Sequence, residues 1–74
     1  MNIQDVKALV ASAITFCEAS QDPCLKEMLH DRIDVFLSKF TDIMGRPLDS
    51  FKSDKKVSDD VEELAAQLRE CFTV

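Results

Sequence analysis

Apolar residues recur every three or four positions along most of the chain, which is the period of a helix with one buried face. The first such segment is predicted over residues 3–19. One arc of this helix carries its apolar side chains, which are Ile3, Val6, Leu9, Val10, Ala13, Ile14, Phe16 and Cys17. Asn2 precedes the segment and is expected to cap it, because its side-chain oxygen can accept from backbone N–H groups of the first turn.

A second helix is predicted over residues 23–44. Asp22 is expected to be its N-cap, Pro23 suits the first helical position, and Gly45 suits the left-handed end. Its apolar stripe consists of Leu25, Leu29, Ile33, Phe36, Phe40 and Ile43. The break between the two helices is short, so helices of about 25 and 33 Å are expected to fold back as an antiparallel hairpin.

A third helix is predicted over residues 59–72, with Asp59 and Asp60 in the first turn, where the helix dipole favours negative charge. Its apolar stripe consists of Val61, Leu64, Ala65, Leu68, Cys71 and Phe72. The linker 45–58 is expected to be anchored to the core by Leu48 and Phe51, through a short turn of helix.

Three amphipathic helices bury their stripes most simply by packing together. We therefore predict an all-α fold, a small three-helix bundle built on a long antiparallel helical hairpin, with residues 1–74 as a single domain. A chain of 74 residues buries only about 60% of its unfolded surface, so its stability is marginal. Dimerisation would be one way to complete such a core.

The net charge of −5 argues against direct binding of nucleic acid or of an anionic membrane, since both need clustered Lys and Arg. The N-terminus has neither the basic start nor the long apolar run of a signal peptide. Three cysteines make an odd number without a metal-binding spacing, which favours a reducing compartment. We therefore expect a cytoplasmic protein that does not enter a membrane.

The segment "DPCLKEMLHDRID", residues 22–34, concentrates side chains capable of chemistry. Glu27 and His30 have the spacing with which helical bundles hold carboxylate-bridged metals, but such ligands point inward between helices. Here the carboxylates project away from the predicted core. We interpret them as a solvated acidic face and expect no metal and no other cofactor. This acidic face consists of Glu27, Asp31, Asp34 and Asp42.

No catalytic residues are assigned, and the protein is not expected to be an enzyme. The only partner available to His30 is Asp34, its neighbour one turn away, and general acid–base catalysis also needs a positioned substrate pocket. Cys17 and Cys71 lie on apolar stripes, where a cysteine usually serves as a small apolar side chain.

Cys24, Met28 and Val35 lie off the core stripe of the second helix, beside the acidic face. Single exposed apolar residues are normal, so these three need have no function. The functional interpretation is a contact with a partner helix or with a second copy of the chain. On this interpretation the protein is a protein–protein interaction module, an adaptor or regulatory subunit, and is expected to be a homodimer.

Two alternatives stay open. The first is an acidic inhibitor of bacterial or phage origin, which mimics nucleic acid to block a nucleic-acid enzyme. Besides the acidic face, it would use the carboxylates of the third helix, which are Asp59, Asp60, Glu62, Glu63 and Glu70. Its binding should weaken steeply with salt, whereas binding through apolar side chains should not. The second alternative is a small chaperone or subunit that covers a helix of a larger complex.

Overall fold

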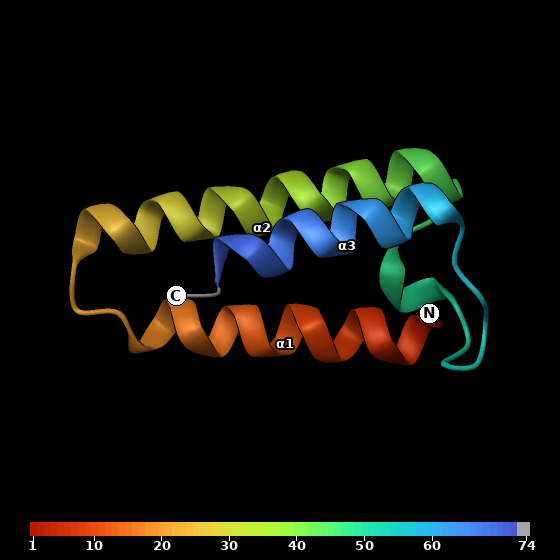
Figure 1. The fold of residues 1–74 in the computed structure, drawn as a ribbon, viewed down its shortest axis with the longest axis horizontal. Helices are drawn as coiled ribbons and strands as arrows, with labels where there is room; N and C mark the ends of the chain where they lie inside the picture. The colour runs from red at the N-terminus through yellow and green to blue at the C-terminus, as the bar shows by residue number, and fades with distance from the viewer. Residues whose placement is uncertain (73–74) are drawn as a thin grey trace.

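The computed structural model describes residues 1–72 and shows the predicted all-α three-helix bundle (Figure 1). Helix α1 spans Ile3–Ala19, α2 spans Pro23–Met44 and α3 spans Asp59–Cys71, with a single 3-10 turn, η1, at Leu48–Ser50. Helices α1 and α2 form the antiparallel hairpin, and α3 runs back along it from the end where α2 stops (Figure 1). Phe72, expected inside the third helix, is its C-cap.

Short polar contacts fix where the first two helices begin. The Asn2 side chain accepts from the Asp5 N–H at 3.0 Å, and the Asp5 carboxylate accepts from the Asn2 N–H at 3.0 Å. This reciprocal pair satisfies two donors at the helix start, as a capping box does. Asp22 accepts from the N–H groups of Cys24 and Leu25 at 2.9 and 3.3 Å. Both predicted N-caps are therefore confirmed.

Gly45 ends α2 in the left-handed conformation, with φ at 79° and its N–H donating to the Thr41 carbonyl at 2.8 Å. A Cβ at this position would meet no other atom within 4 Å. The cost of Gly45→Ala therefore comes from the backbone alone, and we expect a loss of about 1 kcal/mol in the free energy of unfolding, measured by urea denaturation. Gly45→Asn should lose less, because Asn tolerates this conformation. Wild-type stability in Gly45→Ala would contradict the left-handed cap.

The core lies where the three helices and η1 meet. Its buried apolar residues are Ile3, Val6, Val10, Ala13, Cys17, Leu29, Ile33, Phe36, Phe40, Leu48, Val61, Ala65 and Leu68. The ring of Phe40 is fully buried and meets Phe51 edge-on, with 6.0 Å between the ring centroids. Leu48 is buried and Phe51 half-buried, so the predicted anchoring of the linker is confirmed.

The linker also closes the open end of the hairpin. Its carbonyls at Lys55 and Ser53 accept from the N–H groups of Ile3 and Gln4 at 2.8 and 2.9 Å. These donors lie in the first turn of α1, where a helix has no internal acceptor for them. The amino terminus donates to the Glu62 carboxylate of α3 at 2.8 Å. The start of α1 is thus joined to both the linker and α3.

Several residues predicted on buried stripes are exposed instead: Ile14, Phe16, Leu25, Ile43 and Cys71. One cause is the length of α3, which has 13 residues against 22 in α2, or about 20 against 33 Å. Helix α3 ends before it reaches the turn between α1 and α2, so the residues near that turn lack a third helix over them (Figure 1). The other cause is that each predicted apolar arc covers more of the helix circumference than the two neighbouring helices can bury.

Candidate interaction surface

The predicted strip of Cys24, Met28 and Val35 is exposed along one side of α2. We call these three residues the outer strip. Met28 is 51% exposed and Val35 40%, the former being the most exposed large apolar side chain among residues 1–72. Helical spacings of four and seven residues place all three within about 40° of one another around the helix. The three side chains of the outer strip therefore share one side of the helix, and the exposed Asp31 lies between Met28 and Val35 along it.

Carboxylates line one side of the outer strip. Cys24 and Met28 border a shallow depression together with Glu27, His30, Asp31 and Asp34, all of them residues of α2. Every one of these side chains is exposed. Asp42, the last member of the acidic face, is exposed further along α2 and does not border the depression. The predicted acidic face thus lies on the surface beside the apolar side chains.

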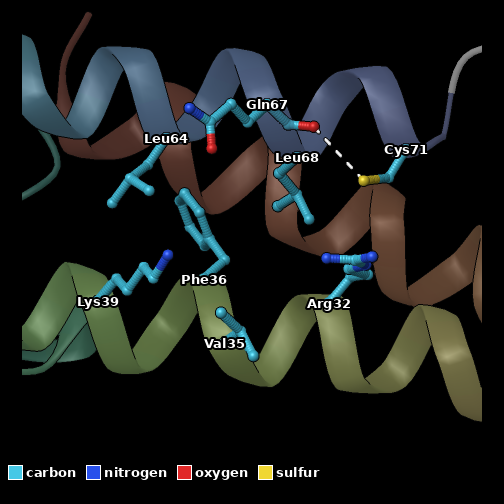
Figure 2. A pocket seen from close by; sticks show the side chains of 8 residues that line it. All are labelled: Arg32, Val35, Phe36, Lys39, Leu64, Gln67, Leu68 and Cys71. Carbon is cyan, nitrogen blue, oxygen red and sulfur yellow. Dashed lines mark hydrogen bonds between the residues drawn. The ribbon is translucent and has the colours of Figure 1, made fainter.

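Basic side chains line the other side. Val35 borders a groove between α2 and α3, to which α2 also contributes Arg32, Phe36 and Lys39 (Figure 2). Helix α3 contributes Leu64, Gln67, Leu68 and Cys71. Arg32 and Lys39 reach from α2 toward α3 on either side of the Phe36 ring (Figure 2). The cavity measures about 90 Å³, far below the several hundred Å³ typical of small-molecule sites, so it suits a single protruding side chain.

The basic residues of this groove have no polar partner among residues 1–72. Arg32 and Lys39 form no ion pair or hydrogen bond with any of residues 1–72. The sequence explains this for Arg32, because the residues three and four positions away on either side are Leu29, Met28, Val35 and Phe36. The guanidinium is therefore free to bind a carboxylate from outside the chain.

Sequence reasoning missed the groove. The prediction assigned Cys71 to the core as a small filler, and this is wrong: Cys71 is exposed at the groove, with its Sγ 3.5 Å from the Gln67 carbonyl oxygen (Figure 2). Cys17 is buried as expected, and its thiol donates to the Lys26 carbonyl at 3.3 Å. The spacing of Arg32 and Lys39 beside Val35 was a usable signal, but the contribution of α3 was not visible in the sequence.

Among residues 1–72, the side chains that could act as an acid–base pair or as metal ligands are not grouped into a site. His30 and Asp34 are both exposed and share no hydrogen bond. Within residues 1–72, no three side chains among His, Cys, Asp and Glu are grouped so that they could hold a metal ion. Over the same residues, no helix combines the length and the apolar character needed to cross a bilayer.

Comparison with known proteins yields no relative. No protein-family model matches the chain, and the comparisons with curated proteins and with solved structures found no match. The functional interpretation therefore rests on the surface of α2 and on the groove beside it.

Proposed function

We propose that this protein is a protein–protein interaction module, an adaptor or regulatory subunit, that binds through the outer strip of α2. Its first partner is a second copy of the chain. The observation that carries the proposal is the position of the outer strip. Carboxylates lie on one side of it, and Arg32 and Lys39, which form no ion pair within residues 1–72, lie on the other. Apolar contact supplies affinity in such a surface, and the flanking charges supply orientation.

Energetic considerations support self-association. A bundle of this size has a small core, and burying Met28 and Val35 against a partner would add apolar contact. Helix α2 is already folded by its packing against α1 and α3, so binding orders only side chains. The strip is narrow, and the interface should lie at the small end of the range for specific complexes. Weak, concentration-dependent association is the expected result.

Two substitutions test the surface. We expect Met28→Glu and Val35→Lys each to weaken self-association by about tenfold or more, because each places a charge at the apolar centre of the interface. Sedimentation velocity over a concentration series measures the effect. Ile14→Glu is the matched control, since Ile14 is an exposed apolar residue of α1 outside the surface. Helicity by circular dichroism should be the same in all variants. Wild-type association in both Met28→Glu and Val35→Lys would contradict the proposal.

The nucleic-acid-mimicking inhibitor stays a second hypothesis, supported by the exposed carboxylates of α2 and α3. Two observations make its surface less uniform than a phosphate backbone: the amino terminus binds Glu62, and Arg32 and Lys39 border the outer strip. A steep loss of partner binding between low and high salt would favour this hypothesis. We also propose a cytoplasmic location, supported by three cysteines that form no disulfide among residues 1–72.

A further inference from the structure

We infer that two copies of the chain pair with their α2 helices parallel, so that the acidic side of each outer strip meets the basic side of the other. This inference rests on the proposed self-association and adds its geometry. It assigns Glu27 of one copy to Arg32 of the second copy. It likewise assigns Asp34 of one copy to Lys39 of the second.

The positions around α2 carry this inference. Each residue of a helix turns by about 100°. With Cys24 as the reference, Glu27 and Asp34 lie about 60–80° to one side of it. Arg32 and Lys39 lie about 60–80° to the other side. The outer strip therefore has opposite charges on its two sides at nearly equal angles, and all four charged side chains are exposed.

Symmetry then selects the orientation. A two-fold axis parallel to the helices exchanges the two sides, so carboxylates of one copy face cations of the other. A two-fold axis perpendicular to the helices instead makes the two helices antiparallel and places their acidic sides next to each other. Carboxylates would then face carboxylates. In a parallel pair of helices, a charged residue beside the apolar contact faces the residue that lies five positions further along the partner helix. Glu27 to Arg32 and Asp34 to Lys39 both have this offset.

These charges have no competing partner on their own helix. Neither Glu27 nor Asp34 has a Lys or Arg three or four residues away, where an intrahelical ion pair would form. Within residues 1–72 neither carboxylate forms an ion pair or a hydrogen bond. All four charged side chains are thus available for pairing between copies. A two-fold axis parallel to the helices brings each carboxylate to a cation of the second copy.

Asp31 sets a limit on the strength of this dimer. It lies between Cys24 and Val35 along the outer strip, so the parallel arrangement brings the two Asp31 carboxylates toward each other. Like charges at such a position destabilise the pair. Asp31→Asn removes the repulsion while keeping the size of the side chain, and it should tighten the dimer about threefold or more.

Cross-linking at Cys24 tests the orientation directly. In the parallel arrangement each Cys24 lies opposite its counterpart. In an antiparallel arrangement that pairs Met28 with Val35, the two Cys24 residues are about 22 Å apart along the helices. The experiment adds a short bis-maleimide to the reduced full-length Cys71→Ser variant, with the Cys24→Ser, Cys71→Ser double variant as control. We expect a covalent dimer in the first protein and none in the second.

Charge reversal provides the second measurement. Glu27→Lys with Asp34→Lys should weaken self-association about tenfold, and Arg32→Glu with Lys39→Glu should do the same. An equimolar mixture of the two double variants should associate again. A dimer that lacks the Cys24 cross-link, or that ignores both reversals, would overturn the parallel pairing and leave the proposed function standing. A chain that stays monomeric at every concentration would overturn both.

Discussion

Replacing Phe40 with alanine is expected to lower the free energy of unfolding by about 3–5 kcal/mol. Phe40 is fully buried at the centre of the bundle, and its ring meets Phe51 of the linker edge-on. The substitution removes a large apolar side chain and leaves a cavity that α1, α3 and the linker cannot close without shifting. A domain of this size is stabilised by only about 4–11 kcal/mol in total, so the expected loss is a large fraction of its stability and should lower the urea midpoint markedly.

Urea denaturation followed by circular dichroism measures this loss, and Phe16→Ala is its control. Phe16 is the same type of residue but is 43% exposed, with one edge-on contact to Phe72 at 5.5 Å between centroids. We expect Phe16→Ala to cost about 1 kcal/mol or less. Equal losses in the two variants would show that the core is not where the structure places it.

Ala65→Glu is expected to have the second large effect, by separating α3 from the hairpin. Ala65 is 1% exposed and lies on the side of α3 that packs into the core. Glutamate there would overfill the space and bury a charge without a partner, and such a burial costs several kcal/mol. The variant should lose a large part of its helicity and its cooperative unfolding transition.

The neighbouring residue offers a matched control. Ala66 is exposed, because one step along a helix turns the side chain by about 100° away from the core. Ala66→Glu introduces the same side chain into the same helix, and we expect it to change the free energy of unfolding by no more than about 0.5 kcal/mol. A tolerated Ala65→Glu, or an equally damaging Ala66→Glu, would contradict the packing of α3.

Much of the fold was predictable because local signals mark where helices begin and end. Asn2, Asp22 and Gly45 each act through contacts or backbone angles within a few residues, and such effects can be inferred from the sequence alone. Periodicity also identified the buried side of each helix. The bounds of α3 were also predicted to within one residue, but periodicity did not show which residues of the hairpin this shorter helix leaves uncovered, and Phe16 and Leu25 are exposed.

Part of the candidate surface was likewise predictable from the sequence, and part was not. The outer strip and the acidic face follow from positions on a single helix, and their exposure was predicted. The groove requires side chains of α3 beside those of α2, and no single-helix pattern contains that information. Cys71 illustrates the difference: its spacing fits the apolar stripe of α3, yet it lies at the edge of the contact with α2, where the thiol stays exposed.

The most direct test of the central claim, self-association through α2, is the mass of the reduced wild-type protein in solution. Light scattering coupled to size exclusion, over a series of loading concentrations, gives this mass without labels. We predict that the mass rises with concentration from the chain mass of 8.4 kDa toward twice that value. Met28→Glu should stay at the chain mass over the same range. A wild-type mass of 8.4 kDa at every concentration would contradict the claim.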